Sequence, residues 1–587
     1  MNTSSNFLCR LTVVAACVLS AYGLAQAQED SIVYRHHSVG SSGFAALEGG
    51  TTFKSIWAMS QTEEVRRQVY ASLGRALAKQ FSGAGTNDLG PLFVPLFSDL
   101  VQFESVADVR GQDGKLEWTV AVRLSEPRQK AWQEAFQQIL TQAKLPIPSV
   151  GKLEGYPAGQ AKFSEREFSW VSAGDWLVAG LGVGLGVGRP AQLGTMISGI
   201  KTAGRPVAAL AGPWIKVNAD LSRLRRSFPL LPEFIGSKLE LTMAGKGEGV
   251  RTDAKLLFPE PLNWQAEEWQ IPLNSIMDPV VGFSAARGIE RLLRKNDEVG
   301  LLQLPAFPNQ ACSWSVASVP YFTFVAAPLT GVSNIMWNAL PMLPTLITNH
   351  GKLSGQLLWV TNNTQIVWQG LPIMTPVVRP LFDGGREFIQ AGMMPLPSHV
   401  RKPPEELFQF TKRANLAWYD WEITEERVNA WRRIYMLGLL GFLRESPMTN
   451  APTQRLLDQL GQGRKLGNSI SELTVTGPSE LSFLRHSQVG LTGLEIVSIL
   501  RWIDSSNFPF TWESTPFMDF KKNSALRKAS RTNAGPRQVT PMPPSRQVPS
   551  KPAPGAATGA KPSGGASSLK LPAPAPAKPV QPSAPKP

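Results

Sequence analysis

The chain has 587 residues, 43% of them hydrophobic, and a formal net charge of +14 at pH 7. This length allows several domains, and the apolar content is enough for a large packed core. The charge is uneven: twelve lysines and arginines and no acidic residue lie between Phe520 and Pro587, and without these and Arg10 the chain keeps 46 basic and 45 acidic residues. A near-neutral body argues against a nucleic-acid-binding protein, so we expect no nucleic acid partner.

The first 27 residues have the pattern of a secretory signal peptide. A polar start ends in Arg10, an apolar run follows over 11–24, and Ala25-Gln26-Ala27 offers a small-residue cleavage site. The run is too short to span a membrane, since a helix needs about 20 apolar residues to do so. We expect cleavage after Ala27, export to the periplasm or the extracellular space, and no transmembrane helix in the mature chain. A lipoprotein acylated at Cys17, which ends a lipobox-like sequence, is the less favoured alternative.

The body combines hairpin patterns with helical patterns. Residues 63–81 have helical periodicity, and two pairs of apolar segments, 239–242 with 250–252 and 357–360 with 365–368, are separated by turn sequences. This mixture favours an α+β fold rather than a doubly wound sheet. We expect two related units of antiparallel hairpins with packed helices, residues 28–270 and 271–525, followed by a disordered tail over 526–587.

One internal repeat supports the two units. Residues 124–132 match residues 423–431 with four identities at an offset of 299. Each match lies between an alternating apolar segment and a helical stripe, which indicates a strand, an N-cap at Ser125 or Thr424, and a helix. We therefore expect 118–140 to superpose on 417–439. A weaker echo relates residues 43–46 to 282–285.

Metal and thiol chemistry have little support in the sequence. Once the signal peptide is removed, Cys312 is the only cysteine, and its strand-like surroundings predict a buried, inert thiol. The histidines have no metal-ligand spacing, so we expect no metal site and no cofactor; they are His36, His37, His350, His399 and His486.

The paired carboxylates Asp420 and Glu422 are the weak catalytic candidates. Two residues apart on a strand, they share one face at a separation of about 6.6 Å, close to the lower limit for an inverting glycosidase. Trp418 lies beside them and would suit a sugar ring. The corresponding residues of the first repeat, Ala121 and Arg123, are not carboxylates. A solvated strand face is therefore the preferred interpretation.

The C-terminal segment has a composition typical of disorder. Fifteen prolines lie between Pro536 and Pro587, separated by alanine, serine, glycine and lysine. Such a segment buries too little apolar surface to offset the entropy of ordering. We expect either a solvated spacer or a tether, in which the basic tail binds an anionic envelope polymer or a membrane surface.

Several strings resemble one family: 258–262, 278–289 and 418–424. They are similar to uncharacterised exported proteins of Verrucomicrobia-type bacteria. The resemblance covers most of the body but not the tail. It implies export, and it implies no activity, because none of these strings is an active-site motif.

Two function classes remain open from the sequence. The first is a non-catalytic exported envelope protein with a binding or scaffolding role, favoured by the lack of catalytic motifs and by the tail. The alternative is an exported hydrolase that acts on envelope or extracellular polysaccharide through Asp420 and Glu422.

Overall fold

The computed structural model divides the chain into two compact units, residues 1–525 and 526–587. All residues that the structure describes lie in the first unit. The expected signal peptide and tail lie outside them. The described residues are 32–81, 89–112, 115–146, 148–163, 166–183, 191–223, 238–264, 267–296, 307–316, 323–339, 356–360, 365–369, 375–394, 403, 405–438, 451–462, 466–505 and 508–509.

The described residues contain twenty strands in one sheet, and every hydrogen-bonded pair among them is antiparallel. The first ten strands are β1 (Ile32–Ser38), β2 (Ser105–Gln112), β3 (Lys115–Arg123), β4 (Ser149–Leu153), β5 (Tyr156–Phe163), β6 (Arg166–Ala173), β7 (Trp176–Val183), β8 (Ile215–Asp220), β9 (Lys238–Lys246) and β10 (Gly249–Leu257). The other ten are β11 (Val280–Arg287), β12 (Gln310–Val316), β13 (Thr323–Pro328), β14 (Gln356–Val360), β15 (Gln365–Gln369), β16 (Val377–Asp383), β17 (Arg386–Gly392), β18 (Leu416–Ile423), β19 (Asn468–Gly477) and β20 (Glu480–Ser487).

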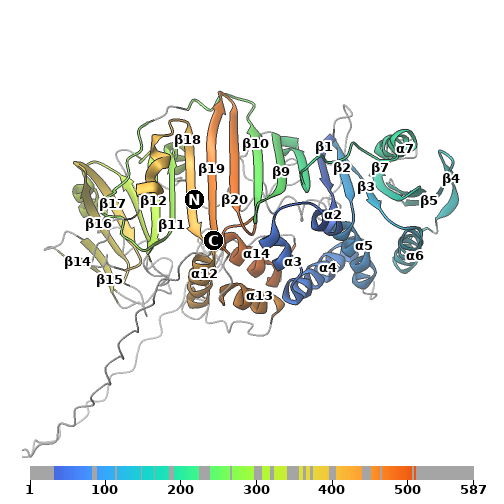
Figure 1. The fold of residues 1–587 in the computed structure, drawn as a ribbon, viewed down its shortest axis with the longest axis horizontal. Helices are drawn as coiled ribbons and strands as arrows, with labels where there is room; N and C mark the ends of the chain where they lie inside the picture. The colour runs from blue at the N-terminus through green and yellow to red at the C-terminus, as the bar shows by residue number, and fades with distance from the viewer. Residues whose placement is uncertain are drawn as a thin grey trace, which may run out of the picture. The chain divides into compact units, whose positions relative to one another are not determined.

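The two sets of ten strands have the same order, read from the edge of the sheet to its centre. The first set runs β4-β5-β6-β7-β3-β2-β1-β8-β9-β10. The second runs β14-β15-β16-β17-β13-β12-β11-β18-β19-β20. The sets join where β10 pairs with β20 (Figure 1). In the matched order β1 occupies the place of β11, and β8 that of β18.

Helices pack against the sheet and against one another. Near the centre of the sheet, α4 packs on α5 and α13, and α12 packs on α13 and α14 (Figure 1). The described helices are α2 (Gly40–Ala46), α3 (Thr51–Trp57), α4 (Ser60–Phe81), α5 (Gly90–Gln102), α6 (Glu126–Gln142), α7 (Ala191–Ala203), α9 (Glu290–Asn296), α10 (Val332–Ala339), the 3-10 helix η2 (Glu405–Lys412), α12 (Thr424–Gly438), α13 (Pro452–Gly461) and α14 (Gly493–Asp504).

Both faces of the sheet are covered at β11 and β18. Phe283 points to one face, where it packs near Phe410 of η2, with ring centroids 5.5 Å apart. Its neighbour Ser284 points to the other face because side chains alternate along a strand. On that second face Glu422 of β18 meets the first turn of α14. Alternation in the sequence therefore separates two buried faces here, and neither is the solvated face expected for Asp420 and Glu422.

The predicted α+β class and several predicted elements are confirmed. The two hairpins are β9–β10 and β14–β15, and α4 covers the predicted helix over 63–81. Cys312 is buried in β12, as expected. Burial also raises the pKa of its thiol to about 12.

The repeat at an offset of 299 is correct locally and wrong in its place in the sheet. Both copies are a strand followed by a helix, β3–α6 and β18–α12. However, β3 lies between β2 and β7, whereas β18 lies between β11 and β19. In strand order β3 corresponds to β13, so the two segments are not equivalent. The weaker echo is also wrong, since residues 43–46 are helical in α2 and 282–285 belong to β11.

The expected N-caps are only partly present. Ser125 occupies the N-cap of α6, but its side chain makes no capping hydrogen bond. Thr424 is the first residue of α12, and its buried hydroxyl has no partner among the described residues. The cap that does form is at α14, where Thr492 and Glu495 make a complete capping box.

Candidate functional site

Asp420 and Glu422 lie side by side on the α14-facing side of β18. Their partners on the adjacent strands are small: Ser284 and Ser471 flank Asp420, while Gly282 and Ser469 flank Glu422. These short residues leave space for the two carboxyls beneath the helices. Glu422 is 4% exposed, and Asp420 is half-buried.

Arg427 of α12 reaches these carboxyls from the helix that follows β18. Its Nε atom lies 3.8 Å from Oε2 of Glu422, and Nη1 donates a hydrogen bond to Oγ of Ser315 at 2.6 Å. The approach depends on Gly282, because a Cβ atom there would lie 2.8 Å from Cδ of Arg427. The guanidinium also lies 5.2 Å from the ring centroid of Trp431, a cation–π contact within α12.

Glu422 also caps α14. Its Oε1 atom accepts a 2.6 Å hydrogen bond from the backbone N–H of Gly493, the first residue of that helix. A carboxylate at this position satisfies an amide that has no partner within the helix, and it faces the positive end of the helix dipole. A Cβ at Gly493 would lie 2.7 Å from Cβ of Arg427. Glycine therefore lets α12 and α14 meet directly above Glu422.

A second ion pair completes the arrangement. Arg485 of β20 forms a bidentate bridge to Glu495 of α14, with distances of 2.7 and 3.1 Å, and its Nε donates to Oγ of Ser471 at 2.8 Å. The two charged side chains are 4% and 1% exposed. Glu495 also accepts from the backbone N–H of Thr492 at 2.9 Å. One carboxylate therefore caps α14 and binds it to the sheet.

Together Asp420, Glu422, Arg427, Arg485 and Glu495 form what we call the polar cluster. It has three carboxyl groups and two guanidinium groups. Burial raises the pKa of Asp420 and of Glu422, and the charge of Asp420 raises that of Glu422 further, while Arg427 opposes both shifts. With three carboxyl and two guanidinium groups, one proton bound by either Asp420 or Glu422 would make the cluster neutral, which is the state that burial favours.

The space beside the carboxyls is small. Its polar lining consists of Asp420, Glu422, Arg427 and the serines Ser284, Ser313 and Ser315. The cavity has a volume of about 20 Å³. This is room for about one water molecule. It has no room for a sugar ring, and Trp418 does not line it. Instead, Nε1 of Trp418 donates to Oγ of Ser284 at 3.0 Å.

The equivalent place in the first ten strands is mainly apolar, with His36 at the position of Ser284. The β9–β10 turn corresponds to the β19–β20 turn. From these turns, the hydrogen-bonded partners on successive strands assign each residue of the first set an equivalent residue in the second. Seven positions of one hydrophobic core then correspond to seven glycine or polar residues. The corresponding residues, with the core residue first, are Tyr34 and Gly282, Val109 and Ser315, Val217 and Asp420, Ala219 and Glu422, Leu239 and Ser469, Leu241 and Ser471, and Ala254 and Arg485.

This comparison explains what the fold requires and what it does not. The same strand order carries mainly apolar side chains in one set, and serines, a glycine and three charged residues in the other, so the strand arrangement alone does not demand the polar cluster. What the second set gains is polar contact to two specific helices, α12 through Arg427 and α14 through Glu495 and the N–H of Gly493.

The sequence prediction found two of the five residues of the polar cluster. It missed Arg427, Arg485 and Glu495. A signal for Arg427 was present: it lies four residues before Trp431 and next to Val428, on the apolar stripe of α12, where a charge needs a buried partner. No comparable signal identifies Arg485, because its partner becomes a neighbour only when α14 folds back over β20.

Among the described residues, no helix is long and apolar enough to cross a membrane. In the same residues, no three His, Cys, Asp or Glu side chains are grouped so that they could hold a metal ion. Comparison of the chain with protein-family models, curated proteins and solved structures gives no match.

Proposed function

We propose that this chain is a non-catalytic exported envelope protein that binds or scaffolds. The observation that carries the proposal is the setting of Asp420 and Glu422. The two carboxyls lie in a network that joins α12 and α14 to the sheet, beside a cavity with room for about one water molecule. Their role is to hold helices in place, and the space beside them has no room for a polymer substrate.

The competing function is hydrolysis of a polysaccharide. The raised pKa of Glu422 would suit a general acid. A glycosidase, however, needs both carboxyls on opposite sides of a bound sugar. Here Glu422 is engaged by Gly493 and Arg427, and Asp420 lies next to it on the same strand. The geometry therefore favours the structural role.

Export and tethering belong to the same proposal. The signal peptide 1–27, cleaved after Ala27, places the chain outside the cytoplasm, and the tail 526–587 attracts an anionic envelope polymer or membrane surface. Support comes from the composition: twelve basic and no acidic residues follow Phe520. Attraction of this kind is screened over about 10 Å at 0.1 M salt.

The two sets of ten strands are, in this proposal, two related units that arose by duplication. Equal strand order and matched hydrogen-bond partners support it. The boundary between residues 270 and 271 falls in the segment between β10 and β11. The six polar replacements and Gly282 then mark the second unit as the one that gained a new role.

Co-sedimentation tests the proposal. Mature full-length protein is mixed with purified cell-wall polymer or anionic vesicles at 20 mM and 500 mM salt. We expect more retention at low salt than at high salt, and retention at low salt reduced to the high-salt level when the twelve basic residues after Phe520 are changed to glutamine. Retention at neither salt concentration would overturn the binding role. Retention unchanged by the neutral tail would show that the tail is a spacer.

A further inference from the structure

An open pocket lies at the turn end of the β19–β20 hairpin, whereas α14 follows the other end of β20. It has a volume of about 450 Å³, which is within the range of small-molecule sites. Its wall is formed by the segment that follows β10, by the β19–β20 turn and by the residue before β18. The side chains that line it include Pro261, Asn263, Trp264, Asn415, Thr476 and Pro478.

The backbone of this pocket is tied together by hydrogen bonds. The N–H of Phe258 donates to Ser479 at 2.9 Å, that of Leu262 to Pro478 at 2.8 Å, and that of Val475 to Asn415 at 2.9 Å. These bonds join three segments that are far apart in sequence. A binding site held in this way loses little conformational entropy when a ligand arrives.

Trp264 has a fixed position in the pocket. Its ring lies against Gly288, which has a φ of +75°, and a Cβ there would come within 2.3 Å of the ring. On the same side the guanidinium of Arg287 lies 5.8 Å from the ring centroid. Arg287 in turn donates to backbone carbonyls of Arg413 and Leu416, next to Asn415. The indole and the β18 wall of the pocket are therefore positioned by the same residue.

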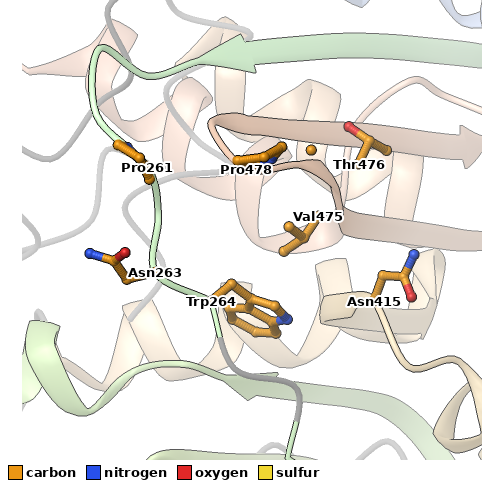
Figure 2. A pocket seen from close by; sticks show the side chains of 8 residues that line it. Pro261, Asn263, Trp264, Asn415, Val475, Thr476 and Pro478 are labelled. Carbon is orange, nitrogen blue, oxygen red and sulfur yellow. The ribbon is translucent and has the colours of Figure 1, made fainter.

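The polar groups are amides and a hydroxyl. Figure 2 shows Trp264 between Asn263 and Asn415, with the indole nitrogen on the side of Asn415. That nitrogen is buried and has no acceptor among the described residues. Both asparagines are exposed. The hydroxyl of Thr476 donates to Glu480 at 2.9 Å, which leaves its lone pairs free to accept.

The charge of the lining selects the ligand class. Every lining residue is uncharged, so the pocket offers an anion no counter-charge. A flat aromatic ring, two amides that donate and accept, and proline edges match a neutral ring with hydroxyl groups on its rim and C–H groups on its face.

We propose that this pocket binds a short neutral oligosaccharide, with a sugar ring beside Trp264 and its hydroxyl groups on Asn263, Asn415 and Thr476. This inference rests on the proposed binding role and names its ligand class. The tail and the pocket then recognise different features of one envelope: the tail responds to charge and the pocket to the sugar ring. Only the tail contribution is sensitive to salt.

Isothermal titration of the mature full-length protein in 0.5 M salt tests the proposal, with cellotriose and tri-N-acetylchitotriose as probes and trigalacturonate as the charged comparison. We expect at least one neutral trisaccharide to bind and trigalacturonate not to bind. Trp264→Ala should weaken binding at least about tenfold, and Asn415→Ala by about fivefold. Trp264→Phe, which keeps an aromatic ring, should lose less than Trp264→Ala and serves if the alanine variant does not fold.

Two controls lie away from the pocket. Phe382, which is 70% exposed, and the exposed Asn334 are changed to alanine, and neither change should alter affinity. The inference is overturned if neither neutral trisaccharide binds, or if folded Trp264 and Asn415 variants bind as the native protein does. Such a result leaves retention on cell-wall polymer at low salt untouched, so failure of the pocket is distinguishable from failure of the binding role.

Discussion

Replacing Arg485 with methionine leaves Glu495 with a buried charge and no guanidinium partner. The two side chains are 4% and 1% exposed, so water does not replace the lost partner in the folded state. Methionine has a similar length and fills most of the space. The change therefore tests the charge and not a cavity.

The expected cost follows from this burial. Removing one partner of a buried ion pair typically costs about 3–5 kcal/mol, because the other charge stays desolvated. The loss falls first on α14, since Glu495 is its capping-box residue and Arg485 is its bond to β20. If the free energy of local opening of α14 falls by about 3 kcal/mol, its amides exchange at least about 100-fold faster.

Hydrogen exchange of α14 amides in native and variant protein at pH 7 is the assay. The matched control is the double variant Arg485→Met/Glu495→Gln, which removes both charges and keeps a capping-box residue at position 495. Its α14 amides should exchange within about tenfold of the native rate. The reasoning fails if the single variant exchanges less than fivefold faster, or if the double variant is no better than the single one.

Three further predictions concern other parts of the fold. Glu422→Gln should remove a pH dependence of stability. Because the pKa of Glu422 is raised in the folded state, the native protein loses stability as the pH rises from the ordinary carboxyl pKa toward the folded one. Urea unfolding should therefore show the variant less destabilised, relative to the native protein, at pH 8.5 than at pH 4.5, and an equal difference at both pH values would contradict this. Gly493→Ala should cost about 1–3 kcal/mol by forcing α12 from α14, while Gly194→Ala, with no atom near its new methyl group, should be neutral or stabilising in thermal unfolding. In protein that begins at Gln28, Cys312 should resist a thiol reagent until unfolded, and rapid reaction of folded protein would refute its burial.

Local sequence patterns correctly predicted the elements whose residues are close together in the chain. The hairpins β9–β10 and β14–β15 and the helix α4 follow from alternation, turn residues and helical periodicity. The repeat at an offset of 299 misled for the same reason: a strand followed by a helix is a local unit, and two such units can occupy different places in a sheet. Place is set by pairing, which brings β18 beside β11 across 128 residues of chain between Arg287 and Leu416.

The sequence correctly predicted that Asp420 and Glu422 share a strand face, but wrongly predicted that this face is exposed to solvent. Alternation correctly placed Asp420 and Glu422 on one face of β18. It did not say what covers that face, because α14 begins 71 residues after Glu422 and reaches it only in the folded chain. A strand pattern separates two faces and does not tell a solvated face from one buried beneath a helix.

Release of reducing ends from purified envelope polysaccharide tests the central claim most directly. Mature full-length protein and the variant Asp420→Asn/Glu422→Gln are incubated with the polymer, and both soluble sugar and bound protein are measured. The non-catalytic role predicts no release by either protein and equal retention of both on the polymer at low salt. Release by the native protein that disappears in the variant would contradict it, and would assign the two carboxyls to catalysis.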